Sequence, residues 1–265
     1  MLVERELAIR DFVPKDYLEI VATFGPVGPE GPQGSYQGTW FRPAEPGKEK
    51  EWDAREARRL SADGEEAGRI VERVKTGRAA VESVTAETKR MAAPLLYDLT
   101  ELQRHANRLY GYSAQRTLEL AQALYEKHKV LTYPRTDSRA LPEDYLKVAK
   151  DTMAMLAKET LPGSLRELSR HAAKAVKEGY VKPARRVFDN TKVSDHFAII
   201  PTLQAPSGLS EAEQKVYDLV VRRFLAVFFP SAEYLVTTRI SQVVGHHFRT
   251  EGKVLVKPGW LAIYG

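Results

Sequence analysis

Cysteine is absent from all 265 residues of the chain, so disulfide bridges and metal sites built from thiolates are excluded. No stretch approaches the roughly 18 consecutive apolar residues of a membrane-spanning helix. The first residues, MLVERELAIRDF, are charged and lack the apolar segment of a secretory signal peptide. We therefore expect a cytoplasmic protein with no membrane partner.

Two common binding patterns are also missing. The sequence has no glycine-rich phosphate loop, and the adjacent His246 and His247 have no third ligand at a suitable spacing. These absences predict no metal site within the chain. The charge balance, 40 basic against 35 acidic residues, gives a net charge of +5 and only a mild preference for polyanions. A chain of this length can hold one large domain or two small ones.

Hydrophobic patterning divides the chain into a strand-rich part and a helical part. Before Pro94 we expect the end of a helix near Ile9, strands at 17–24, 36–41 and 79–92, a Gly/Pro loop at 25–34 and a helix over 52–78 that is broken near Gly64. Strands return after Pro230, at 233–240, 243–250 and 253–264, of which the first two form a hairpin.

The region between them is expected to be helical. Thr100 and Ser113 are candidate N-caps, Gly111 a helix stop, and Ser210 with Glu213 a capping box. The helices are predicted from Thr100 to Gly111, from Ser113 to about Tyr125, and over 141–158, 164–178 and 211–229. The fold class is therefore α+β, with a discontinuous strand-rich domain at 1–93 and 231–265 interrupted by a helical domain at 94–230.

The segment LTYPRTDS, residues 131–138, concentrates reactive side chains. Pro134 disfavours the helical region for the residue before it, so this segment should be extended. Side chains alternate in extended chain. One face would then hold Tyr133, Arg135 and Asp137, and the other Thr132, Thr136 and Ser138. A phenol beside a guanidinium suits nucleophilic attack on a phosphate ester, although a surface turn is the plain alternative.

Two motifs resemble those of a known family. The segment LTYPRTDSRALP, residues 131–142, resembles the active-site segment of the type IA DNA topoisomerases, specifically the topoisomerase III branch. The segment SDHFAIIPT, residues 194–202, is similar to that branch's DHHAIIPT. His196 falls on the family's active-site histidine, and Phe197 replaces the usual second histidine. The stretches GYSA at 111–114, TL at 117–118 and AQALYE at 121–126 resemble the helix that leads to the family tyrosine.

The resemblance implies an ATP-independent bacterial isomerase that relaxes and decatenates DNA. Tyr133 would attack single-stranded DNA and become 5′-phosphotyrosyl, while Arg135 and His196 stabilise the phosphate. Asp195 or Asp137 could hold His196 protonated, and Asp137 could instead orient Arg135. Thr136 and Ser138 would donate to phosphates or only stabilise the turn. The strand-rich domain would form the arch of a toroidal enzyme.

In that family, magnesium and its acidic ligands belong to a Toprim domain that carries an Asp-x-Asp pattern, which this chain lacks. We therefore expect a fragment without the N-terminal Toprim domain and the C-terminal remainder. Magnesium would be a cofactor of the full-length enzyme, and the fragment alone should be inactive. The partners expected are single-stranded DNA and a helicase or single-strand-binding protein.

A basic run could contact DNA. Its members are Lys182, Arg185, Arg186 and Lys192, with Tyr180 and Phe188 among them. Interleaved cations and rings are typical of single-strand binding, but a solvated loop is equally compatible with this pattern. Thr132 is a further candidate contact. The alternative function is a non-catalytic module that has the same fold and only binds single-stranded DNA.

Overall fold

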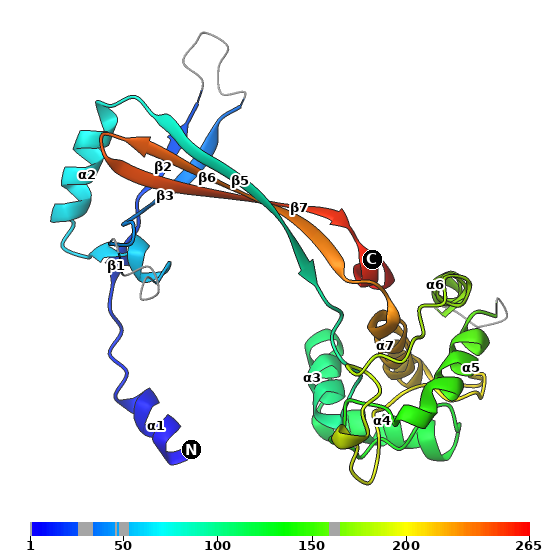
Figure 1. Cartoon of the computed structure of the whole chain (residues 1–265). Helices are drawn as coiled ribbons and strands as arrows, with labels where there is room; N and C mark the ends of the chain where they lie inside the picture. Colours follow the sequence, from blue (N-terminus) through cyan, green and yellow to red (C-terminus); the bar gives the residue numbers. More distant parts are fainter. Residues whose placement is uncertain (1, 26–33, 46, 48–52, 159–164) are drawn as a thin grey trace. The chain divides into compact units, whose positions relative to one another are not determined.

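A computed structural model describes residues 2–25, 34–45, 47, 53–158 and 165–265. The Gly/Pro loop predicted at 25–34 lies largely outside these residues, as does the start of the helix predicted over 52–78. The chain divides into two compact units, one of residues 1–89 and 235–254 and one of residues 90–234 and 255–265 (Figure 1). In the described part of the chain, no helix has the length and apolar character needed to cross a membrane.

The strand-rich unit is built on a sheet in the order β2-β3-β7-β6-β5. Its elements are α1 (Leu2–Arg10), β1 (Tyr17–Leu18), β2 (Val21–Phe24), β3 (Tyr36–Phe41), η1 (Glu56–Arg58), β4 (Leu60–Ser61) and α2 (Glu65–Lys75), joined by parts of β5 (Ala80–Met91), β6 (Ala232–Val243) and β7 (His246–Lys257). Strand β3 runs antiparallel to β7, with Trp40 opposite Phe248. Both side chains are buried in a small core with Phe24 and Ile70.

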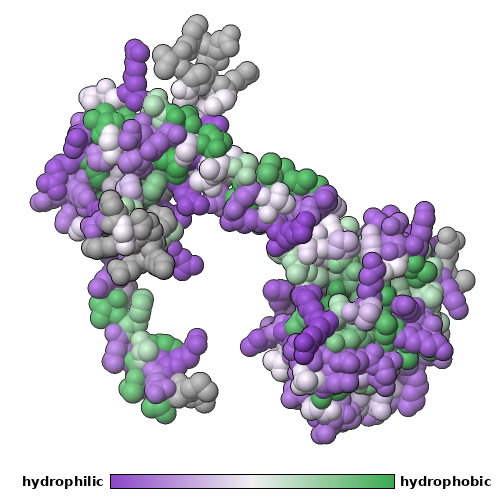
Figure 2. All heavy atoms as spheres, viewed as in Figure 1, coloured by the Kyte–Doolittle hydropathy of each residue, from purple (hydrophilic) through white to green (hydrophobic). Residues whose placement is uncertain are grey.

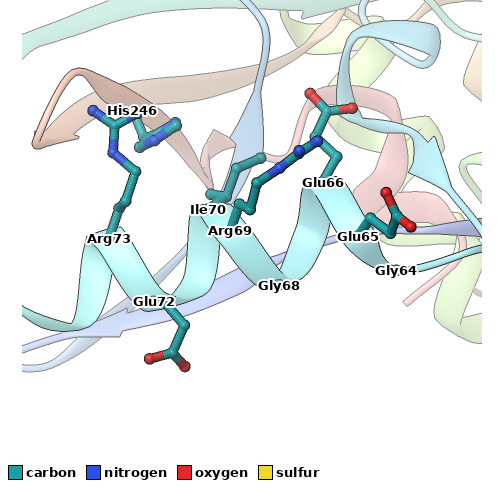
Figure 3. Close-up of a pocket in the computed structure, with 9 residues that line it drawn as sticks. All are labelled: Gly64, Glu65, Glu66, Gly68, Arg69, Ile70, Glu72, Arg73 and His246. Carbon is teal, nitrogen blue, oxygen red and sulfur yellow. The ribbon is translucent and has the colours of Figure 1, made fainter.

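Two predictions in this unit are wrong. Residues 17–24 form two short strands rather than one, because β1 pairs with β4 in a separate small sheet and β2 pairs with β3. Among the described residues of the helix predicted over 52–78, only Glu65–Lys75 are α-helical. Gly64, in the left-handed conformation with φ 78°, precedes that helix. Helix α2 buries Ala67 and Ile70, while Glu72 on the opposite side of the helix is exposed (Figure 3).

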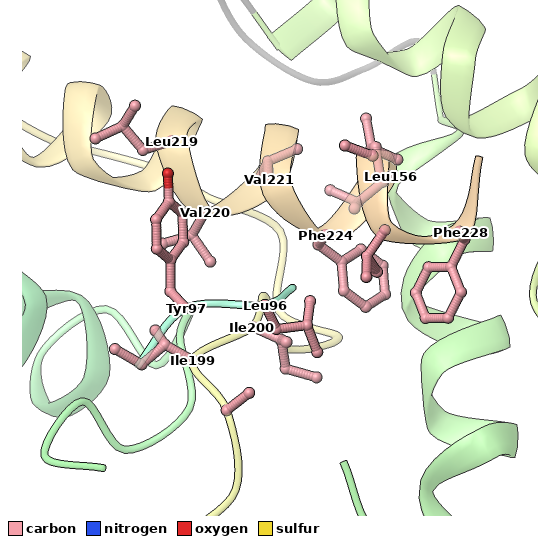
Figure 4. Packing of buried hydrophobic residues seen from close by; sticks show 14 of the residues in the cluster. Leu96, Tyr97, Leu156, Ile199, Ile200, Leu219, Val220, Val221, Phe224 and Phe228 are labelled. Atoms are coloured by element: carbon pink, nitrogen blue, oxygen red, sulfur yellow. The ribbon is translucent and has the colours of Figure 1, made fainter. Parts of the chain in front are cut away.

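The helical unit packs around α7. Its elements are α3 (Leu99–Tyr110), α4 (Ala114–Glu126), η2 (Glu143–Tyr145), α5 (Leu146–Leu156), α6 (Leu165–Lys177), η3 (Asn190–Lys192), α7 (Glu211–Phe228) and η4 (Gly259–Ile263). Val220 and Phe224 of α7 are fully buried against residues of irregular segments such as Leu96 and Ile200 (Figure 4). The outside of this unit is mostly hydrophilic on the face shown in Figure 2. The predicted α+β fold class is confirmed.

Local cap signals predicted three helix ends in this unit. Ser113 caps α4, Gly111 ends α3 in the left-handed conformation with φ 68°, and Ser210 and Glu213 form the predicted capping box. Thr100 is not a cap, because Asp98 accepts the hydrogen bond from the Glu101 N–H at 2.7 Å and the helix begins earlier.

Two further element boundaries differ from the predictions. The helix expected from Leu141 begins at Leu146, because Leu141 is bridged to Phe188. The predicted hairpin of β6 and β7 is present, but its strands are longer than expected. The separate strand predicted over 253–264 is wrong, because residues 253–257 are the end of β7 and residues 259–263 form a 3₁₀ turn. Pro258 between them has no N–H to continue the ladder.

Candidate active site

The tyrosine segment follows α4 and presents alternating faces. Pro134, Thr136 and Ser138 are buried, whereas Arg135 and Asp137 are exposed. This alternation agrees with the period of extended chain that Pro134 predicts. The segment therefore offers its charged side chains to solvent and turns its hydroxyls inward.

The inward hydroxyls bind the segment that carries His196. Thr132 Oγ1 donates to the Ala198 carbonyl at 3.0 Å and accepts from the Ile200 N–H at 2.9 Å. Thr136 Oγ1 donates to the His196 carbonyl at 3.0 Å, and Ser138 Oγ donates to the Lys192 carbonyl at 2.7 Å. Three hydroxyls spaced along one segment thus attach it to the other.

Main-chain bonds continue this pairing. The Thr132 N–H donates to the Ile200 carbonyl and the Thr202 N–H to the Val130 carbonyl, both at 3.0 Å. The segment that contains Tyr97 and Leu99 binds both of the others. The Ile199 N–H donates to the Tyr97 carbonyl at 2.8 Å, and the Leu99 N–H donates to the Thr136 carbonyl at 3.0 Å. The Tyr133 and His196 segments are therefore held in one register.

This register places Tyr133 beside His196. The ring centroids lie 4.3 Å apart with an interplanar angle of 45°. On another side, the Tyr133 ring meets Tyr125 of α4 in a nearly perpendicular contact at 5.4 Å. A ring in contact with two neighbours has little freedom to turn, so the phenol has a defined direction. Tyr125 was missed as a site residue, although it lies in the AQALYE stretch.

The supporting polar residues are arranged differently from the sequence expectations. Asp137 Oδ1 accepts a hydrogen bond from Ser194 Oγ at 3.3 Å, a residue that was not singled out. Asp195 is exposed, as are Arg135 and His196. Asp137 thus adds a further link between the two segments. Phe197, where the resemblance leads one to expect a histidine, lies against the Tyr145 ring with centroids 4.6 Å apart.

The two rings of the basic run differ in burial, since Tyr180 is half-buried and Phe188 is fully covered. Phe188 is buried in the core, and the Tyr180 ring packs against Phe229 at a centroid distance of 5.1 Å. The hydrogen bond from the Thr191 hydroxyl, together with Lys192 at 2.9 Å, lowers the pKa of Asp189 to about 2.

The four cations of the run differ in what they contact. All four are exposed, and Arg186 also donates to the Ala93 carbonyl. Phe188 is unavailable for stacking, whereas the cations of the run remain accessible from solvent.

Metal binding finds no support in the side-chain arrangement. Within the ranges that the structure describes, no three His, Asp or Glu side chains are grouped closely enough to hold an ion. The described residues around Tyr133 therefore do not form a magnesium site.

Comparison with known proteins shows consistent similarities. The sequence model described as DNA topoisomerase matches residues 1–265. A DNA topoisomerase 3 of Shouchella clausii is 38% identical over 98% of this chain, and one of Bacillus subtilis is 35% identical over 100% of it. The chain spans about a third of the length of these relatives, 32% and 33%.

A solved structure shows the same fold. Full-length topoisomerase I from Thermotoga maritima superimposes with a TM-score of 0.59 over 98% of this chain and 38% of that one, at 19% sequence identity. The match to so much of the chain extends the similarity from sequence to three-dimensional architecture.

Proposed function

The chain belongs to the DNA topoisomerase family, and from this premise we propose that it supplies the nucleophile of a type IA, topoisomerase III-like enzyme. The observation that carries the proposal is the contact of Tyr133 with His196, since a phenol and an imidazole from two separate motifs meet at one surface. In this proposal residues 1–93 and 231–265 are the arch domain, and residues 94–230 are the domain that carries the tyrosine.

The reaction is a reversible transesterification. The Tyr133 oxygen attacks a phosphorus atom of single-stranded DNA, the bond to the 3′ oxygen breaks, and the phosphate stays on the tyrosine as a 5′ ester. Arg135 can hold the two non-bridging phosphate oxygens, and His196 can donate a hydrogen bond to one of them. Attack by the 3′ hydroxyl reverses the step, so no ATP is needed. Between the two steps another strand passes, which gives relaxation and decatenation.

The remaining predicted site residues position these groups. Thr132, Thr136 and Ser138 use their hydroxyls on the backbone of the His196 segment, so we propose that they set the distance between the phenol and the imidazole rather than contact DNA. Asp137 acts through Ser194 in the same way. Asp195 precedes His196 in the chain and is exposed on the same segment.

Parts of the reaction lie outside this chain. We propose that magnesium and the group that takes the phenol proton come from a Toprim domain elsewhere in the protein, because no metal site is formed by the residues described here. Lys182 and Arg185 remain candidates for contact with the DNA backbone. A helicase or single-strand-binding protein as partner, and a cytoplasmic location, belong to the same proposal.

A covalent-trapping assay tests the function. The chain is incubated with labelled single-stranded DNA and magnesium, with and without a separately produced Toprim-containing piece, and quenched in denaturant. Label should remain on the protein only when the Toprim piece is present, and should be lost in Tyr133→Phe. Binding without an adduct in any condition would favour the non-catalytic DNA-binding module instead.

A matched variant sharpens the assay. Tyr125→Phe keeps the ring that contacts Tyr133 and removes a phenol from the same surface. It should form the adduct at close to the normal level, whereas Tyr133→Phe should form none. If the adduct were lost in Tyr125→Phe and kept in Tyr133→Phe, Tyr125 would be the nucleophile and the proposal would be wrong.

A further inference from the structure

A cavity of about 550 Å³ lies in the helical unit and is lined by none of the proposed active-site residues. Its walls come from α6, from the end of α7 and from the ends of β6 and β7 that belong to this unit. The residues that matter for its chemistry are Arg170, His171, Lys174, Tyr180, Phe229 and Lys257. Pockets of roughly 300–1,000 Å³ are typical of sites for small molecules, so the cavity can hold one nucleotide.

The cavity has an excess of positive charge. Arg170 and Lys174 are one helical turn apart on α6, and within the described part of the chain neither forms an ion pair. Glu233 also lines the cavity, but Lys257 at 2.8 Å and Arg90 at 3.2 Å bind its carboxylate. These partners lower the pKa of Glu233 and neutralise its charge toward a ligand. Two cations therefore remain uncompensated.

Aromatic rings form another part of the wall. Tyr180 meets Phe229 edge to face at 5.1 Å, and His171 meets the same ring at 6.1 Å. Burial and the neighbouring cations lower the pKa of His171, so its ring is neutral at pH 7. Cations beside aromatic rings match the two parts of a nucleotide, because the phosphate binds to positive charge and the base stacks on a ring.

We propose that this cavity binds one nucleotide unit of single-stranded DNA, with its phosphate between Arg170 and Lys174 and its base against Tyr180. The proposal rests on the proposed function, since it takes the same substrate and adds a second contact outside the active site. An acidic peptide would satisfy the cations, but it has no group that would use the aromatic wall. The strand is therefore the better match to the whole surface.

Photo-crosslinking of the whole chain tests the site directly. The probe is an oligodeoxythymidine carrying 5-iododeoxyuridine, and the products are mapped after digestion with trypsin. Tyr180 lies in the peptide 178–185 and Tyr133 in the peptide 130–135, so the two sites are read separately. We expect crosslinks in both peptides. Crosslinks in 130–135 alone would refute DNA binding in the cavity and leave the proposed function intact. Crosslinks in 178–185 alone would support binding in the cavity and contradict the proposed function.

A pair of variants measures the contribution of the cations. Arg170 and Lys174 are exposed, so Arg170→Ala/Lys174→Ala should fold normally. It should weaken oligonucleotide binding about tenfold at low salt and reduce the salt slope by about 0.7, since the one phosphate held between the two cations contributes about 0.7 on a single strand. Lys177→Ala, also exposed and on the same helix but outside the cavity, should leave both unchanged.

Competitors identify the occupant. Unlabelled oligodeoxythymidine should abolish the crosslink to 178–185, while polyglutamate of equal charge should leave most of it. Polyglutamate that competes as well as the oligonucleotide would mean that the cavity is a peptide site. Full competition by thymidine monophosphate at the same nucleotide concentration would mean that it binds free nucleotides rather than a strand.

Discussion

Replacing Thr132 with valine would remove one hydroxyl from the residue next to the proposed nucleophile and keep the branched shape of its side chain. That hydroxyl donates to the Ala198 carbonyl and accepts from the Ile200 N–H. Ala198 and Ile200 are both fully buried, so water cannot easily replace the lost partner. Thr132→Val therefore leaves one acceptor and one donor with fewer bonds in the interior.

The expected cost follows from these two groups. Leaving a buried polar group without its partner costs about 1–3 kcal/mol, and the better burial of a methyl group offsets about 1 kcal/mol of the sum. We expect the free energy of unfolding of the helical unit to fall by about 3 kcal/mol. Domains of ordinary stability have only about 5–15 kcal/mol in total, so this loss is large.

Hydrogen exchange resolved to single amides is the appropriate assay, because two units need not unfold in one step. Amides in the centre of α7 report the global free energy of the helical unit, and the Ile200 amide reports the lost bond directly. Thr132→Ser is the matched control, since it keeps the hydroxyl and removes a methyl group. It should cost no more than about 1 kcal/mol.

The activity of the same variants separates stability from positioning. In the adduct assay with the Toprim piece, Thr132→Val should form less product even at a temperature where it is folded, and Thr132→Ser should stay near the normal level. A Thr132→Val protein whose α7 and Ile200 amides exchange as slowly as in the unchanged chain would refute the assignment of the hydroxyl to this bond.

Two further predictions concern the same unit. Burial, with Arg223 and Arg108 nearby, lowers the pKa of His105 from 6.5 to about 4, so the unfolded chain binds the proton first and stability should decline as pH falls between these values. His105→Gln should remove that decline in urea titrations across this range, and an unchanged slope would contradict it. Lys129 has a left-handed φ of 60°, so Lys129→Gly should stabilise the chain by about 0.5 kcal/mol. Lys129→Ala should not stabilise the chain, because alanine has the same backbone strain at this φ. If the two variants had equal urea midpoints, backbone strain at Lys129 would be refuted.

Short-range signals carried much of the prediction. Ser113, Gly111 and the pair Ser210 and Glu213 mark helix ends because each satisfies main-chain groups within a few residues of itself. Pro134 likewise acts on its immediate neighbour, and the alternation that follows it is visible in the burial of residues 134–138. The motifs around Tyr133 and His196 identified the family because they are local in the chain.

Predictions failed where distant residues compete for the same groups. The helix after Tyr97 is capped by Asp98 rather than Thr100, and Tyr97 itself is bridged to Ile199. Residues 17–24 split because β3 and β4 lie in different sheets and each pairs with part of that stretch. Phe188 reads as a loop residue in a basic run, yet it is buried near Phe228, with ring centroids 6.0 Å apart. None of these partners is near in sequence.

The sequence by itself determined the helix ends at Gly111, Ser113 and Ser210, the extended tyrosine segment, and the chemical character of Tyr133, Arg135 and His196. Only the tertiary structure decided that the Tyr133 and His196 rings meet. It also decided that the hydroxyls of Thr132, Thr136 and Ser138 form hydrogen bonds with main-chain groups, and that a cavity forms beside Arg170. The physical reason is the range of the interactions. A cap or a proline acts through covalent neighbours, whereas a ring contact, a hydroxyl bridge or a cavity requires segments that meet only when the core around α7 is packed.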